Sequence, residues 1–162
     1  VEKDTNGLWF FNNSPNAGAS QPHRHLQLLR RTHTNNMFPR QGWFEKYINN
    51  PNDKSISLYK SCMTLRRKKL FCPYELDDLY KCLCIQMKLG SKEVYSKPLT
   101  SYNLLITSEW ISLITRKFES YRGFNINALG FAGYILITKK SDVKWLLNNN
   151  CENLLEAVVL GD

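Results

Sequence analysis

Two of the three histidines, His23 and His25, lie two residues apart, directly after the small-residue loop of residues 17–21. An apolar run precedes this loop and another follows the histidines, a pattern that predicts a strand, a loop and a second strand. Alternate residues of a strand share a face. We therefore expect His23, His25 and Gln27 to point to one side of the second strand and Arg24 to the other.

Such a row of imidazoles and an amide could line a polar site. The loop offers unhindered backbone N–H groups and the hydroxyl of Ser20, which suit a cluster of anionic oxygens. An imidazole next to this cradle can attack phosphorus and carry the transferred group covalently. The two histidines could instead bind a metal, or satisfy backbone groups and solvent, so the pattern alone leaves these alternatives open.

The order of the residues narrows the choice. It resembles the active-site signature of the histidine-triad superfamily at Asn12, Gly18, Ser20, His23, His25 and Gln27. More narrowly, the segment resembles the diadenosine tetraphosphate phosphorylases, also called ATP adenylyltransferases, whose triad has a glutamine in place of the third histidine. Parts of residues 101–133 resemble that family's C-terminal segment, so the resemblance covers roughly residues 8–30 and 98–160.

The resemblance implies an α+β fold, with a histidine-triad-like antiparallel sheet and flanking helices. It also implies phosphorolysis of diadenosine tetraphosphate to ATP and ADP through an adenylyl-histidine intermediate. His25 would be the nucleophile, the backbone carbonyl of His23 would hold the proton of its other ring nitrogen, and Gln27 would favour an acceptor other than water. Asn12 would brace the loop and phosphate. The phosphate contacts would fall on Gly18, Ala19, Ser20, Gln21 and Gln27.

A candidate adenine site lies further along the chain, at residues 124–133. If this stretch is helical, Asn127, Phe131 and Tyr134 share one face, and an amide with two aromatic rings could hold the base. A core element with a buried asparagine is the alternative. Arg116 ends a predicted strand, where it could pair with a phosphate or lie on the surface.

Other functions remain open. A dinucleoside polyphosphate hydrolase of the same superfamily would share the site, and a non-catalytic nucleotide-binding fragment would keep it without turnover. The hexose-1-phosphate uridylyltransferase branch is disfavoured, because Arg24 and Leu26 stand where its motif has Pro and Gly. A nucleic-acid-binding module has little support, since the basic run of residues 66–69 lacks interleaved aromatic residues. The expected partners are diadenosine tetraphosphate, ATP, ADP and inorganic phosphate, with no required cofactor or metal, although Mg²⁺ could accompany the polyphosphate.

Composition sets wider bounds. The 162 residues suit a single domain over residues 1–162, and the net charge of +8 attracts polyanions such as nucleotides. Five cysteines, an odd number without a Cys-x-x-Cys pair, favour a reducing compartment and therefore the cytoplasm. No signal peptide and no apolar run long enough to cross a membrane is evident, and the sequence leaves the oligomeric state open.

The sequence begins at Val1 without an initiator methionine. The resembled family carries a substantial portion before its histidine motif, so we expect the N-terminal part of the family fold to be absent. Residues 35–70 are polar and rich in turn residues, which predicts an irregular insertion. Within it we expect a short helix near residues 43–48 and a strand at residues 55–59.

The remaining elements follow from local patterns. Apolar spacing predicts a helix over residues 73–88 that covers one face of the sheet. Two β-rich runs, residues 102–107 and 110–115, predict a hairpin. Ser141 is expected to cap a helix over residues 142–147, and a last amphipathic helix is expected at residues 153–160. His33 is expected to be an ordinary surface histidine.

Overall fold

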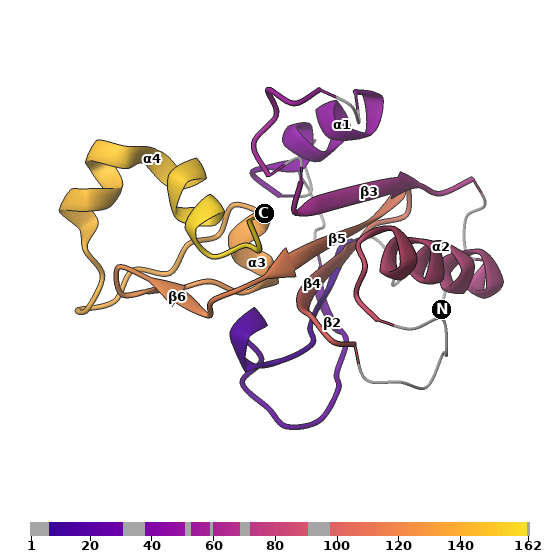
Figure 1. Cartoon of the computed structure of the whole chain (residues 1–162), viewed down its shortest axis with the longest axis horizontal. Coiled ribbons are helices and arrows are strands. Elements are labelled where there is room, and N and C mark those ends of the chain that lie inside the picture. The colour runs from indigo at the N-terminus through magenta and orange to yellow at the C-terminus, as the bar shows by residue number, and fades with distance from the viewer. Residues whose placement is uncertain are drawn as a thin grey trace.

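A five-stranded antiparallel sheet forms the centre of the computed structural model (Figure 1). The structure describes residues 7–30, 38–50, 53–58, 60–68, 72–90 and 98–161. The strands are β1 Gly7–Asn12, β2 Gln27–Arg30, β3 Cys62–Arg66, β4 Ser101–Ile106 and β5 Trp110–Arg116, in the spatial order β2-β1-β4-β5-β3. A separate ribbon pairs β6 Ser120–Tyr121 with β7 Phe124–Asn125. The helices are the 3₁₀ helix η2 Pro15–Ala17, α1 Gln41–Asn49, α2 Pro73–Gln86, α3 Ala128–Phe131 and α4 Val143–Ala157.

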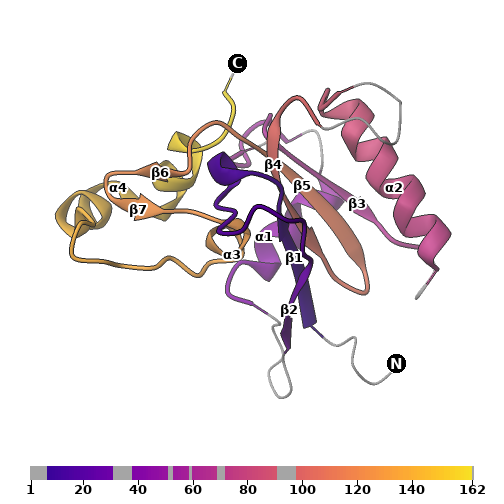
Figure 2. The same ribbon diagram turned by 90° about the horizontal axis from the view of Figure 1, so that it is seen from below.

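Helices cover both faces of the sheet, because successive strand residues point to opposite sides. On one face, Tyr102, Leu104 and Leu113 pack with Leu83 of α2. On the other face, residues of β1 and β5 pack with residues of α1, α3 and α4. Figure 2 shows α2 on one side of the sheet and α3 and α4 on the other. This is the α+β architecture with an antiparallel sheet and flanking helices that the sequence predicts.

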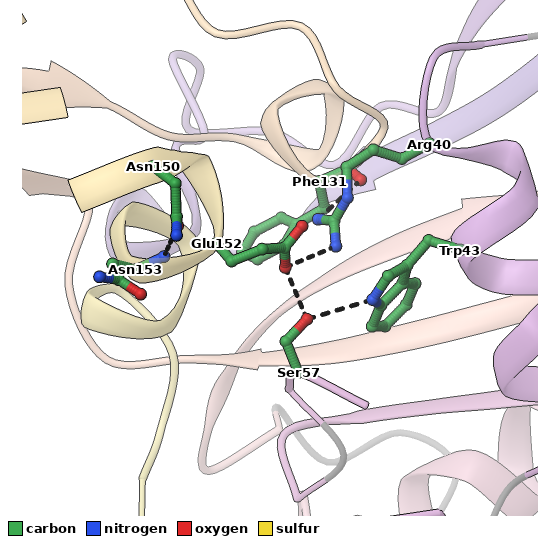
Figure 3. Close-up of polar contacts among 7 residues, drawn as sticks. All are labelled: Arg40, Trp43, Ser57, Phe131, Asn150, Glu152 and Asn153. Carbon is green, nitrogen blue, oxygen red and sulfur yellow. Dashed lines mark hydrogen bonds and ion pairs between the residues drawn. The ribbon is translucent and has the colours of Figure 1, made fainter. Parts of the chain in front are cut away.

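A polar cluster joins α4 to the beginning of α1 (Figure 3). Arg40 Nη2 lies 2.9 Å from Glu152 Oε2, and the same oxygen accepts a 2.5 Å hydrogen bond from Ser57 Oγ. Trp43 Nε1 donates to Ser57 Oγ at 3.1 Å, while the Arg40 guanidinium lies over the Trp43 ring. These contacts hold three segments that are far apart in the sequence. Glu152 is the centre of the cluster, because its Oε2 accepts from both Arg40 and Ser57.

Several predicted elements are present. The helix near residues 43–48 is α1, the helix over residues 73–88 is α2, and the predicted hairpin is β4 with β5. The two expected C-terminal helices are two halves of α4, which is interrupted at Asn150 with φ of 63°. Its N-cap is Asp142, which accepts from the backbone N–H of Trp145, so the prediction of a Ser141 cap is wrong.

The prediction of an irregular insertion over residues 35–70 is wrong for the described part of that range. It contains α1, and it contains β3, which pairs with β5 at an edge of the sheet. The predicted strand at residues 55–59 is also wrong, because residues 54–58 form turns; Tyr59 lies outside the described residues, as does His33. The apolar alternation of residues 55–59 places Ile56 and Leu58 in the core without a strand.

A buried arginine closes one end of the sheet. Arg116 is only 2% exposed, which excludes both the surface position and the phosphate contact considered from the sequence. Its guanidinium donates to the carbonyls of Val158 and Phe118 at 3.2 and 2.7 Å, and to Asn103 Oδ1 at 2.6 Å. All three partners are neutral, so the charge is stabilised by dipoles. Burial lowers the pKa of Arg116 to about 10, and the group remains charged at neutral pH.

Asn103 also links the buried arginine to residues near the N-terminus. Its Nδ2 donates to Asn12 Oδ1 at 2.7 Å and to the carbonyl of Ala17 at 2.8 Å. Asn12 Oδ1 also accepts the N–H of Ala128, at the start of α3, at 2.9 Å. One fully buried amide therefore fixes the end of β1, the 3₁₀ helix η2 and, through Asn12, α3.

We predict that Asn103→Ala destabilises the fold. The change removes an acceptor from buried Arg116 and the donor to Asn12 and Ala17, and groups left unpaired in the interior lose their full solvation. We expect the free energy of unfolding to fall by about 3 kcal/mol. This corresponds to a melting temperature lower by roughly 6–12 °C.

The matched control is Asn125→Ala, which removes an exposed asparagine on β7. We expect this control to change the free energy of unfolding by less than about 0.5 kcal/mol. Urea and thermal unfolding followed by circular dichroism measure both variants. Equal stabilities of the two variants would show that the buried amide does not hold these elements together.

Candidate active site

A tight turn leads from β1 into the histidine segment. Its backbone is closed internally, because the N–H of Ala17 and of Ala19 both donate to the carbonyl of Ser14 and that of Gly18 donates to Pro15. Gly18 has φ of 80°, and a Cβ there would lie 2.7 Å from the Cβ of Asn127. A side chain at this position would therefore meet both backbone strain and a steric clash.

The closed turn changes which loop amides can meet a ligand. The N–H groups of Gly18 and Ala19 are already bonded to carbonyls of the turn. Among the described residues, the N–H groups of Ser20 and Gln21 have no protein acceptor. Of the four amides expected from the sequence to stabilise phosphate, these two and the exposed Ser20 hydroxyl remain available.

The two histidines and the glutamine are linked in a chain of contacts. His25 Nδ1 lies 3.2 Å from the backbone oxygen of His23, and His25 Nε2 lies 2.5 Å from Gln27 Nε2. A ring nitrogen that faces a carbonyl carries the proton, and one that faces an amide N–H offers its lone pair. The arrangement therefore selects the tautomer with hydrogen on Nδ1 and the lone pair on Nε2.

The segment before Gln27 is irregular. β2 begins at Gln27, which is opposite Phe10 of β1, so the prediction that His23 and His25 lie on a strand is wrong. Strand alternation therefore does not direct Arg24 away from the histidines. Instead, Arg24 lines a cavity with His23 and a second cavity with His25.

The first cavity is polar and has a volume of about 520 Å³. The end of β1, the turn after it and the segment entering β4 enclose it. It is lined by the predicted site residues Asn12, Ala19, Ser20, Gln21 and His23. The structure thus gathers most of the predicted phosphate contacts around one space.

The second cavity is a groove of about 450 Å³ between α2 and the sheet. His25 lies at this groove, whose walls include Phe11, Leu76 and Leu104. Tyr80 and Tyr102 also line it, with their hydroxyl oxygens 2.7 Å apart. Burial raises the pKa of both tyrosines, so they are neutral hydrogen-bonding groups at physiological pH. A largely apolar groove with a few polar groups has the character of a ligand site.

The predicted adenine contacts lie elsewhere. Asn127 caps α3 by accepting from the N–H groups of Leu129 and Gly130. Phe131 is fully buried, with the Arg116 guanidinium 5.2 Å from its ring centre. Asn127, Phe131 and Tyr134 line neither cavity. Phe131 is therefore a core residue, in line with the alternative of a core element that the sequence leaves open for this stretch.

Asn103, which positions the turn, and the tyrosine pair at the groove are not among the site residues expected from the sequence. One signal for Asn103 was present: it interrupts the apolar run of residues 102–106 with a polar side chain. Such a residue in a central strand requires a buried partner. The sequence around Tyr80 of α2 and Tyr102 of β4 gives no signal that the two side chains meet, because the pair forms only when the helix packs on the sheet.

No group of three or more potential metal ligands occurs within the part of the chain that the structure describes. None of the described helices combines the length and the apolar character needed to span a membrane.

Comparisons with known proteins identify the fold. The model of the ATP adenylyltransferase C-terminal domain matches residues 37–161, and that of the Ap4A phosphorylase N-terminal domain matches residues 2–41. The second match includes the histidine segment. The first includes residues 37–70 of the expected insertion. No curated protein sequence matches the chain significantly.

Three solved structures of yeast Ap4A phosphorylase Apa2 are similar to the chain. The structure titled without a ligand has 20% identity and a TM-score of 0.64, covering 94% of this chain and 55% of that chain. The complex with AMP has 23% identity and a TM-score of 0.69, covering 96% and 56%. The complex with Ap4A has 20% identity and a TM-score of 0.68, covering 98% and 56%.

The chain therefore spans a little over half the length of the yeast enzyme. The family models cover residues 2–161 between them, and the structural likeness extends over nearly the whole chain. On these matches, the chain belongs to the Ap4A phosphorylase/ATP adenylyltransferase family.

Proposed function

We propose that the protein is a nucleotidyltransferase that carries out phosphorolysis of diadenosine tetraphosphate to ATP and ADP. The observation that carries the proposal is the set of contacts around His25. The carbonyl of His23 fixes the proton on Nδ1, which leaves the lone pair of Nε2 as the nucleophile. Membership of the family and the likeness to a yeast enzyme solved with AMP and with Ap4A support the choice of substrate.

The proposed reaction has two displacements at phosphorus. In the first, the lone pair of His25 Nε2 forms a bond to the α-phosphorus of one adenylate, and the bond to the bridging oxygen breaks. The electron pair leaves with ATP. In the second, an oxygen of inorganic phosphate attacks the same phosphorus, the nitrogen–phosphorus bond breaks, and ADP is released with His25 restored. Throughout, the His23 carbonyl stabilises the positive ring through its Nδ1–H.

Negative charge grows on the non-bridging oxygens in both steps. The available N–H groups of Ser20 and Gln21, with the Ser20 hydroxyl, supply donors from a turn that is fixed before substrate binds. Preorganised donors of this kind stabilise a transition state without reorganising during the reaction. The amide of Gln27 is a further donor once it turns from Nε2 of His25 to a phosphate oxygen.

The proposed chemistry uses no resident cofactor, and magnesium would enter with the polyphosphate. The partners are the dinucleotide, ATP, ADP and inorganic phosphate. All five cysteines are free, which agrees with a reducing compartment, and we propose the cytoplasm as the location.

A nucleotide-binding protein without turnover is the second candidate. The observation that favours it is the 2.5 Å contact between Gln27 Nε2 and His25 Nε2, which occupies the lone pair that a transferase would use. A trapped intermediate separates the two functions. Exposure to the dinucleotide without phosphate, followed by mass spectrometry, gives an adenylylated peptide from residues 17–30 if the chain is a transferase. Binding without that peptide favours the second candidate.

We predict that His25→Ala abolishes formation of the adenylylated peptide. The change removes the nucleophile, so we expect the rate of ADP release to fall by about a thousandfold or more. His23→Ala is the matched comparison, because it removes the neighbouring imidazole but keeps the backbone carbonyl that faces Nδ1. We expect a much smaller loss in that variant. Near-normal turnover of His25→Ala would show that the nucleophile is wrongly assigned.

We predict that Gln27→His shifts the products from ADP toward AMP. A second imidazole beside the intermediate can accept a proton from water, whereas an amide cannot. The measurement is the ratio of ADP to AMP at a fixed phosphate concentration. Gln27→Ala serves as the control, since it removes the amide without adding a base. An identical ratio in the histidine variant and the native protein would contradict this role of Gln27.

A further inference from the structure

The two cavities of the candidate site share two residues, Arg24 and Tyr102. The polar cavity contains the turn and His23, and the groove contains His25. Arg24 precedes His25 directly in the sequence. A ligand that bridges the two cavities would therefore pass next to Arg24.

Arg24 is also the only positively charged residue lining either cavity in the described part of the chain, with the histidines counted as neutral. Of the described residues that line the two spaces, none in the polar cavity is a carboxylate and one in the groove is, Asp77. Asp77 is engaged by Lys81 at 2.5 Å. Of the ion pairs among the described residues, none involves Arg24, whose side chain is exposed.

Among the described residues, no hydrogen bond joins the Arg24 side chain to the neighbouring Tyr102 hydroxyl or to another protein group. Tyr102 is 3% exposed, and its hydroxyl is hydrogen-bonded to that of Tyr80. Within the described ranges, the donors of the Arg24 guanidinium thus remain free for a ligand. A planar guanidinium binds two phosphate oxygens at once, and such charge-assisted bonds are stronger than those between neutral groups.

We propose that Arg24 binds the phosphates of the leaving nucleotide, beyond the phosphorus that His25 attacks. The proposal rests on the proposed function and adds a specificity-determining residue to the same site. The transferred adenylate has one phosphate, held by the donors of the turn, whereas the leaving ATP carries three. Arg24 therefore distinguishes a polyphosphate from a monophosphate, and it neutralises charge on the group that departs.

Binding without turnover tests this role. Calorimetry in magnesium-free buffer compares ATP with AMP on the native protein, Arg24→Ala and Arg24→Lys. In Arg24→Ala we expect the Kd for ATP to rise by about tenfold or more, as for loss of a hydrogen bond to a charged group, and the Kd for AMP to stay within about twofold. Arg24→Lys keeps the positive charge but loses the planar guanidinium that binds two phosphate oxygens at once. We therefore expect an intermediate loss of affinity for ATP and no loss for AMP.

Arg66→Ala is the matched control for net charge. Arg66 is exposed, is bonded to Asn49 Oδ1 and lies on β3, at the opposite edge of the sheet from β2. We expect its affinities for ATP and AMP to equal those of the native protein. An equal loss of ATP binding in this variant would show that general electrostatic attraction is responsible, and would overturn the proposal.

The remaining outcomes also decide the question. Unchanged ATP binding in Arg24→Ala, or equal losses for ATP and AMP, would overturn the role of Arg24 while the proposed function stands. Failure of the native protein to bind either nucleotide would overturn both. If thermal melting shows that Arg24→Ala is destabilised, Arg24→Lys decides: a loss confined to ATP supports the role, and any other pattern contradicts it.

Discussion

The fold depends on a buried positive charge that is satisfied by neutral oxygens. Arg116 gives up its hydration, and in return three hydrogen bonds fix its guanidinium between the end of β5, the C-terminal segment and Asn103. Removing a partner from such a group is costly, since the charge stays in the interior. The geometry of Asn103, and through it that of Asn12 and Ala17, is therefore strongly constrained.

This constraint reaches the site through the turn after β1. The carbonyl of Ala17 is held by Asn103, and Gly18 packs directly against Asn127 at the start of α3. The turn is fixed at one end by these buried contacts. At the other end the chain is fixed again at Gln27, the first residue of β2. The irregular segment with His23, Arg24 and His25 therefore lies beside both cavities, and its two ends are held in place by the turn and by β2.

The sequence predicts those elements and contacts that depend on a local residue pattern or on a matching motif. The helix α2 and the hairpin of β4 and β5 have strong periodicity, and the contact between His25 and the His23 carbonyl followed from the resemblance. β3 was missed because turn-rich segments surround it and it gains its order from pairing with β5. Phe131 was assigned to a site because helical spacing cannot tell a core face from a ligand face. Arg116 and Asn103 meet across the hairpin of β4 and β5, but their other partners, Val158 for Arg116 and Asn12 and Ala17 for Asn103, are far away in the sequence. The residues around Arg116 and Asn103 therefore could not reveal this arrangement.

The contact between Gln27 and His25 affects the reactivity of the imidazole. The amide nitrogen of Gln27 lies 2.5 Å from Nε2 of His25, so the lone pair of that ring nitrogen accepts a hydrogen bond. An imidazole in that condition is a poor target for stray alkylating or acylating agents in its surroundings. Gln27 therefore shields the imidazole from such reagents for as long as its amide stays bonded to Nε2.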